Sequence, residues 1–165
     1  MPLAVQDVVV ALFHRNKPDS FHWALAVYGG GDSFVKFHAT NTPGGLWAYK
    51  REDEATTETR PELVALVKIG NLGAVGKTAE DVHDAVKDIN MATPRQDGGR
   101  RTPFDCIIWL RQAVRALDAA GFLECKDAVA LEEECQDIAE QYAPEVLDGE
   151  GTYVIRVSQF SRTMK

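Results

Sequence analysis

The fold is constrained most strongly by a run of alternating side chains that ends in a glycine turn. From Phe21 to Tyr28 large apolar residues alternate with smaller or polar ones, and a second strand-like run follows from Ser33 to Ala39. Gly29-Gly30-Gly31-Asp32 lies between the two runs and is typical of a tight turn. Because side chains alternate between the two faces of a strand, the pattern predicts a β-hairpin with one apolar core face.

The other face of this hairpin carries two histidines. His22 and His38 lie on the two arms at similar distances from the turn, so we expect them to sit side by side on one face of the sheet. His22 shares its face with Ala24 and Ala26, whose small side chains leave room for another element. We expect a helix that carries a cysteine to lie against this face.

The segment 101–121 predicts such a helix. Thr102 is a favourable N-cap, Pro103 suits the first helical position, and Gly121 suits the position just past the C-terminus. A helix should therefore run from about Pro103 to Ala120, with one apolar face packed inward. Cys106 falls in its first turn, where unpaired N–H groups and the helix dipole favour a thiolate. The position suits a nucleophile, and the alternative is a buried cysteine that acts only as a small apolar residue.

The rest of the chain predicts a small set of further elements. Similar signals predict strands at 8–13, 46–50, 63–69 and 152–157, and helices at 79–90 and 126–142, the last ended by Pro144. The segments 51–60 and 92–101 are predicted loops, the second one mobile, rich in arginine and able to cover a site or bind an acidic group. These elements predict one α+β domain over residues 1–165, with an antiparallel sheet packed against the Cys106 helix.

Charge and composition exclude several classes of protein. The net charge is −7 with scattered basic residues, which argues against nucleic acid and anionic membranes as partners. No run approaches the ~20 apolar residues of a membrane-spanning helix. Three cysteines is an odd number, and no apolar N-terminal signal segment is evident. We therefore expect free thiols and a reducing, cytoplasmic location.

The segment from Gly70 to Thr78 has the order of a phosphate-binding loop. The motif requires a glycine at the position where Asn71 stands. We therefore predict no nucleotide cofactor, and we expect Thr78 to cap the following helix.

Taken in order, these residues resemble a known superfamily. The run Phe21-His22-Trp23-Ala24-Leu25-Ala26-Val27-Tyr28-Gly29, then Phe37-His38-Ala39, and later Asp105-Cys106 are similar to the circularly permuted branch of the NlpC/P60 papain-like superfamily. Within it, the similarity is to the lecithin:retinol acyltransferase-like group, and it covers about residues 22–117. Phe104-Asp105-Cys106 also resembles the start of the nucleophile helix in unpermuted NlpC/P60 peptidases.

The sequence departs from both groups after the cysteine. The acyltransferase-like proteins usually have Asn-Cys-Glu-His around the nucleophile, and the peptidases have Ser-Gly after it, whereas this chain has Ile107-Ile108. Many acyltransferase-like members also end in a membrane helix, for which this sequence gives no signal. The resemblance therefore does not imply a substrate in a lipid bilayer.

The resemblance implies a permuted papain-like fold and a thiol mechanism. Cys106 would be the nucleophile, His22 its general base, and His38 the residue that orients the imidazole. N–H groups at the helix start would stabilise the oxyanion. The expected function is a cysteine-dependent hydrolase or acyltransferase, which forms a thioester acyl-enzyme from a small-molecule or peptide amide, ester or thioester without cofactor or metal.

Two other interpretations remain. The chain could be a non-catalytic small-molecule or protein-binding domain of the same fold with Cys106 simply buried, and Ile107 and Ile108 favour this. Alternatively, His22, His38 and Cys106 could be three zinc ligands. The residue types suit zinc, but the short paired spacing of structural zinc sites is missing.

Overall fold

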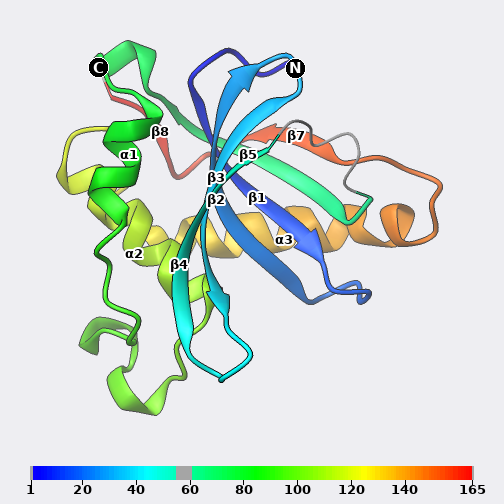
Figure 1. Cartoon of the computed structure of the whole chain (residues 1–165). Coiled ribbons are helices and arrows are strands. Elements are labelled where there is room, and N and C mark those ends of the chain that lie inside the picture. The colour runs from blue at the N-terminus through cyan, green and yellow to red at the C-terminus, as the bar shows by residue number, and fades with distance from the viewer. Residues whose placement is uncertain (1, 55–60, 165) are drawn as a thin grey trace.

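The computed structural model describes residues 2–54 and 61–164, which form an α+β fold with a large sheet and three α-helices (Figure 1). The strands are β1 (Asp7–His14), β2 (Phe21–Gly30), β3 (Ser33–Asn41), β4 (Trp47–Glu54), β5 (Leu63–Asn71), β6 (Leu123–Glu124), β7 (Val154–Val157) and β8 (Arg162–Thr163). The helices are α1 (Ala79–Val86), α2 (Cys106–Ala119) and α3 (Ala128–Leu147), with short 3₁₀ turns η1 (Gly73–Val75), η2 (Arg95–Asp97) and η3 (Gly99–Arg101).

The large sheet has the strand order β4-β3-β2-β1-β5-β7, and β6 pairs with β8 in a separate small sheet. All neighbours in the large sheet are antiparallel except β5 and β7, which run parallel with Leu66 opposite Ile155. The sheet is therefore mixed: the order β4-β3-β2-β1-β5 is antiparallel as predicted, and the β5–β7 pair departs from the prediction. The chain reaches β7 only after α2 and α3, and a long helical connection of this kind lets a strand join in parallel.

The predicted hairpin is formed by β2 and β3. Leu25 lies opposite Phe37 and Val27 opposite Val35, as the alternation predicted. The next strand, β4, is longer than predicted, because residues 51–54 continue the strand where a loop was expected. Charged side chains are well tolerated on such an edge strand. The rest of the predicted loop, 55–60, lies outside the described residues.

Two apolar clusters lie on the two faces of the large sheet. The first joins β-strand residues such as Trp23 and Leu25 to the helices, and the second contains Ala24 and Ala26 and no helical residue of the described ranges. The prediction that the cysteine helix covers the His22 face was therefore wrong. The large side chains on the Trp23 face offer more apolar area, and their burial by α2 and α3 contributes more stability (Figure 1).

The third helix, α3, continues past Pro144 to Leu147, although the sequence predicted an end before the proline. Proline cannot donate the helical hydrogen bond, which costs stability. Ala143 and Val146 are buried in the core cluster, and their burial offsets this cost. None of the helices within 2–54 and 61–164 has the length and apolar character needed to cross a membrane.

The first helix, α1, begins as predicted at its cap. The Thr78 side chain accepts a hydrogen bond from the Asp81 backbone N–H, and the Asp81 side chain accepts one from the Thr78 backbone N–H. This reciprocal arrangement satisfies two N–H groups that have no partner within the helix. Thr78 therefore serves as a helix cap.

The core assignment predicts unequal costs for one substitution at two sites. Leu117 is fully buried in the cluster that includes α2, whereas Leu46 is 74% exposed. Leu117→Ala should lower the free energy of unfolding by about 2–5 kcal/mol through lost burial and a cavity. Leu46→Ala should change it by less than about 0.5 kcal/mol. Urea titration of both variants checks this, and equal losses would contradict the assignment.

Candidate active site

Cys106 is the first residue of α2, and its neighbour Asp105 caps the helix. The Asp105 carboxylate accepts a hydrogen bond of 2.9 Å from the Ile108 backbone N–H. The helix thus begins about three residues later than predicted, and Thr102, in extended backbone, is not its cap. Asp105 is a strong cap placed directly before the helix. Cys106 therefore stands at the positive end of the helix dipole, as the sequence predicted.

The Cys106 thiol contacts two hydrogen-bond donors from the β1–β2 region. Arg15 Nη2 lies 3.6 Å from Cys106 Sγ, and the Trp23 backbone also hydrogen-bonds to the sulfur. Burial raises the pKa of the Cys106 thiol, and the Trp23 hydrogen bond and the Arg15 charge act against this rise. The thiol is therefore neutral at neutral pH, but donors that would stabilise a thiolate already surround it.

Sequence reasoning missed Arg15. It follows β1 in a polar turn, where the composition indicates only an exposed loop. Its contact with Cys106 spans 91 positions of the chain. No local pattern could have revealed it, because the contact depends on where α2 packs.

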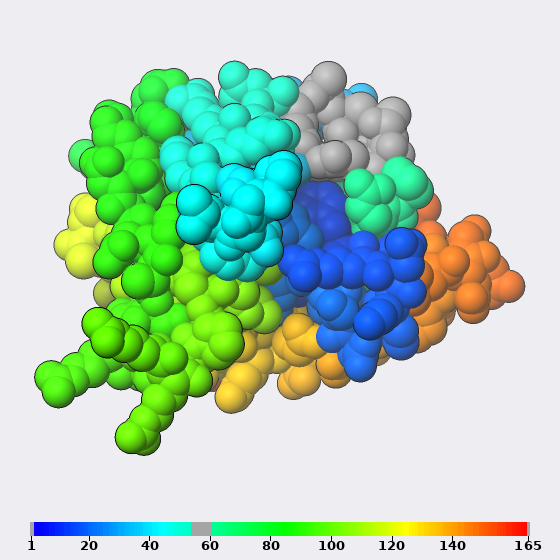
Figure 2. Space-filling model, turned by 60° about the horizontal axis from the view of Figure 1, so that its bottom comes forward, coloured from blue at the N-terminus to red at the C-terminus, as the bar shows by residue number. Residues whose placement is uncertain are grey.

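A pocket of about 410 Å³ lies beside the thiol, lined among others by Arg15, Trp47, Cys106, Ile107 and Glu132. In Figure 2, the blue loop after β1, the cyan β3–β4 connection, the green start of α2 and the gold α3 meet on this face. The volume lies within the range of small-molecule sites. The pocket therefore leaves room for a ligand beside the sulfur, with Ile107 as part of its wall.

The two predicted histidines form a hydrogen-bonded chain with Glu52. His22 Nε2 lies 2.7 Å from His38 Nδ1, and His38 Nε2 lies 2.8 Å from Glu52 Oε2. The structure thus brings His22 and His38 together, as strand alternation predicted. Glu52 was missed because it falls in the segment predicted as a loop. The alternation that begins at Trp47, if extended through the charged residues, would have placed Glu52 on the histidine face.

Burial keeps both histidines neutral. It lowers the pKa of His22 to about 3 and also lowers the pKa of His38, for which Glu52 acts in the opposite direction. For Glu52, burial acts upward, but a hydrogen bond from Lys50 and the charge of Lys36 outweigh it and lower the pKa to about 2. At neutral pH the chain consists of two neutral imidazoles and one carboxylate. A neutral imidazole is the form that can accept a proton.

The structure does not bring Cys106 into contact with the histidines. Within residues 2–54 and 61–164, no hydrogen bond joins its sulfur to either one. Cys106 packs in the cluster with Trp23, whereas the His22 ring lies 6.4 Å from the ring of Phe13, which belongs to the other cluster. Adjacent residues of a strand point to opposite faces, so His22 and Trp23 cannot both face α2. The electrostatic effect of Arg15 reaches both groups, since its charge lowers the pKa of His22 as well as that of Cys106.

The same separation bears on the zinc interpretation. Among the described residues, no group of three or more His, Cys, Asp or Glu side chains is placed to hold a metal ion. Because Cys106 and the histidine pair face different clusters, they do not form a shared ligand set. All three cysteines are free thiols.

Comparison with known proteins places the chain in a sequence family. A family model described as a family of unknown function (DUF6914) matches residues 6–153. No curated protein and no solved structure matches the chain. The matched region runs from the start of β1 to the approach to β7. It therefore contains Cys106, Arg15 and both histidines.

The lowered histidine pKa predicts a loss of stability in acid. The pKa of His22 is about 3 in the folded chain against an ordinary value of 6.5, so the unfolded chain binds a proton that the folded chain excludes between these values. The free energy of unfolding should have its full value above pH 6.5 and fall as the pH drops toward 3. For one proton the fall is at most about 1.4 kcal/mol per pH unit. His22→Gln should flatten this slope between about pH 6.5 and 4.5.

Urea titrations at half-unit pH steps measure the slope. His14→Gln is the matched control, because His14 lies outside the hydrogen-bonded chain and bonds to the Asn16 backbone. It should keep the slope of the natural chain. An unchanged slope in His22→Gln would show that His22 does not cause the acid sensitivity.

Proposed function

The chain belongs to DUF6914, a family of unknown function, and we propose that it is a cysteine-dependent hydrolase or acyltransferase whose nucleophile is Cys106. One observation carries the proposal. The thiol stands at the start of α2 with the Arg15 guanidinium 3.6 Å from its sulfur, at the edge of a pocket of about 410 Å³. A helix start and a neighbouring cation both favour a thiolate.

The proposed reaction has two steps. The ionised sulfur of Cys106 attacks the carbonyl carbon of an amide, ester or thioester, and the amine, alcohol or thiol leaves with a proton. The resulting thioester is then attacked by water or by another acceptor, which releases the acyl group and returns the proton to the sulfur. In the proposal, backbone N–H groups at the start of α2 stabilise the oxyanion of each step.

The resemblance assigns His22 the role of general base and His38 the role of orienting it, and we keep both roles in the proposal. The bond between His22 Nε2 and His38 Nδ1 supports the second role, because it fixes the imidazole. The first requires His22 to come within reach of the sulfur. In the resting structure His22 lies beside Phe13 of the other cluster, so this role needs a rearrangement that carries the imidazole to the sulfur.

The finer assignment of the fold is also part of the proposal. Strands that carry His22 and His38 precede a helix that begins at Cys106, which is the element order of the permuted papain-like fold named above. The helix also packs on the sheet that holds the histidines. The helix α2 packs on the face opposite His22, and the assignment to the permuted papain-like fold has to explain this position.

A second candidate is a non-catalytic domain that binds a small molecule in the same pocket. Two observations favour it. The pKa of the Cys106 thiol is raised by burial, and Arg15 rather than a histidine contacts the sulfur. In this case Cys106 only lines the pocket, and a ligand would bind there without forming a covalent bond to the sulfur.

The two candidates predict different products with an activated ester. If Cys106 is the nucleophile, p-nitrophenyl acetate should acetylate it before Cys125 or Cys135, and hydroxylamine should remove the acetyl group, as it does from thioesters. Arg15→Ala should slow this acetylation about tenfold, since the thiolate loses its cation. Lys17→Ala is the matched control, because it removes an exposed cation from the same turn and should leave the rate unchanged. Intact mass and peptide mapping give the readout.

An acetyl group that maps to lysines or to Cys125, and that persists in Cys106→Ala, would contradict the catalytic candidate. The binding candidate would then be the better account. A melting temperature raised by a ligand, with no mass change, would support it directly.

A series of single variants tests the assigned roles. Cys106→Ala should abolish the acyl-enzyme, and His22→Ala should slow its formation by about 10²–10⁴-fold if His22 is the general base. His38→Gln should cost less, since an amide can still orient the imidazole. Burst-phase spectrophotometry measures the rates, and melting temperatures show whether each variant folds. Full acylation by His22→Ala would remove His22 from the mechanism and leave Arg15 and the start of α2 as the activating features.

A further inference from the structure

The loop between α1 and α2 carries three exposed arginines. Arg95 lies in η2, and Arg100 and Arg101 lie in η3. Within 2–54 and 61–164, their guanidinium groups make no hydrogen bond and no ion pair. In Figure 2 the green atoms of this loop stand out from the body of the molecule at the lower left. The loop therefore presents three cations to solvent on a chain whose net charge is −7.

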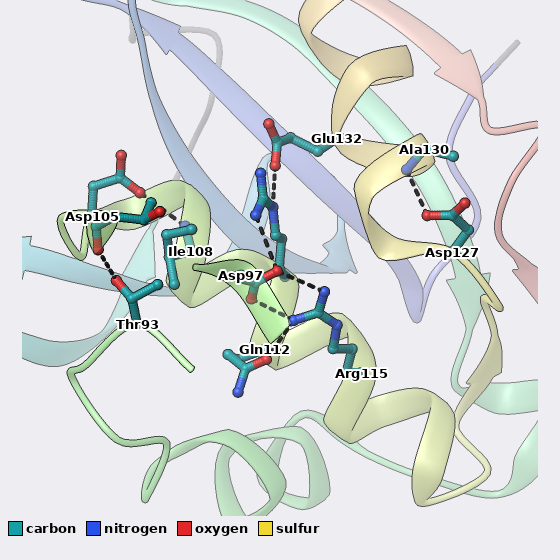
Figure 3. A network of polar contacts seen from close by, with 11 residues as sticks. Thr93, Asp97, Asp105, Ile108, Gln112, Arg115, Asp127, Ala130 and Glu132 are labelled. Atoms are coloured by element: carbon teal, nitrogen blue, oxygen red, sulfur yellow. Dashed lines mark hydrogen bonds and ion pairs between the residues drawn. The ribbon is translucent and has the colours of Figure 1, made fainter. Parts of the chain in front are cut away.

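A part-buried ion-pair cluster ties this loop to α2 (Figure 3). The side chain of Asp97 is only 1% exposed, and it accepts hydrogen bonds of 3.1 Å from Arg111 and of 2.6 and 3.0 Å from Arg115. Hydrogen bonds from Arg115 lower the pKa of Asp97. Asp97, the one carboxylate of residues 95–101, is thus neutralised by arginines of α2 and does not compete for the exposed arginines.

Contacts within the loop hold it a second time. Gly98 adopts a φ of +105°, and a Cβ there would come within 2.1 Å of the Thr102 Oγ1. The Thr93 hydroxyl donates a hydrogen bond of 2.6 Å to the Thr102 carbonyl. Fixing an exposed loop costs conformational entropy. The part-buried ion pairs and the Thr93 hydrogen bond offset that cost, so the arginines are presented on a fixed support.

We propose that residues 95–101 form a binding site for a short acidic segment of another polypeptide. Guanidinium groups recognise carboxylates through paired, charge-assisted hydrogen bonds, and clusters of arginine are a common means of binding acidic or phosphorylated motifs. A fixed loop loses little entropy on binding, which raises the affinity for a given number of contacts.

The charge of the whole chain selects among anionic partners. A long polyanion such as duplex DNA, or an anionic membrane, would extend beyond the loop onto a chain with net charge −7 and be repelled. A short acidic segment contacts the three arginines alone. The site is also separate from the proposed chemistry, because none of residues 92–104 is among those that line the Cys106 pocket. The inference therefore does not rest on the proposed function.

Binding of fluorescein-labelled octaglutamate, followed by fluorescence anisotropy at about 50 mM salt, tests the site directly. The natural chain should bind it, with octaglutamine as the uncharged control peptide. The triple variant Arg95→Ala, Arg100→Ala, Arg101→Ala should lose about tenfold or more in affinity. The control is a second triple variant that removes three exposed cations elsewhere: Lys17→Ala, Lys126→Ala, Arg162→Ala. It changes the net charge by the same amount and should retain the affinity for octaglutamate.

A further variant tests whether the ion pairs of Asp97 matter for binding, and it leaves the three exposed arginines unchanged. Asp97→Asn keeps all three exposed arginines but weakens the tie to α2, so it should lower the affinity several-fold while the melting temperature shows that the chain still folds. An equal loss in both triple variants would reduce the effect to net charge and overturn the proposal. So would the absence of octaglutamate binding, or tighter binding of duplex DNA or of anionic phospholipid vesicles through the same arginines.

Discussion

The alternation of side chains along β2 decides most of what this site can be. Trp23 is fully buried among side chains of the helices, so the residue before it has to face the other side of the sheet. That residue is His22. The thiol of Cys106 therefore meets the Trp23 backbone and Arg15, while the imidazole meets His38. The alternation along β2 thus places the Cys106 sulfur and the His22 imidazole at different faces of the sheet, and any catalytic account has to begin from that separation.

The histidine face has its own physical requirement. A buried polar group costs stability unless it is hydrogen-bonded, and a buried charge costs more. Lys36 is 5% exposed and lies 3.2 Å from the Glu52 carboxylate, which also accepts the hydrogen bond of His38. The network is thus satisfied by one carboxylate that serves both a cation and an imidazole. Burial keeps His38 neutral against the effect of this carboxylate, and the hydrogen bond to Glu52 fixes the His38 ring. The fixed ring orients His22 whether or not His22 takes part in chemistry.

Local patterns were sufficient for the hairpin, for the contact of His22 with His38 and for a cysteine in the first turn of a helix. Each depends only on strand alternation or on a cap next to an apolar run. The same patterns could not reveal that α2 would choose the Trp23 face, because both faces of β2 can be covered and the choice depends on the summed apolar area of several strands. Arg15 was missed for the same reason, since its contact exists only once that face is chosen.

The helix α2 connects the Cys106 pocket to the arginine-bearing loop 95–101. Its first residue carries the thiol, its apolar stripe fills the core, and Arg111 and Arg115, four residues apart, lie on one face of the helix. Both hold Asp97, and Arg111 also pairs with Glu132, which lines the Cys106 pocket. The carboxylates of the loop and of the pocket wall are thus held by the same guanidinium. The core holds the opposite face of the helix in place. A shift of Asp97 or Glu132 therefore disturbs Arg111, which also holds the other carboxylate.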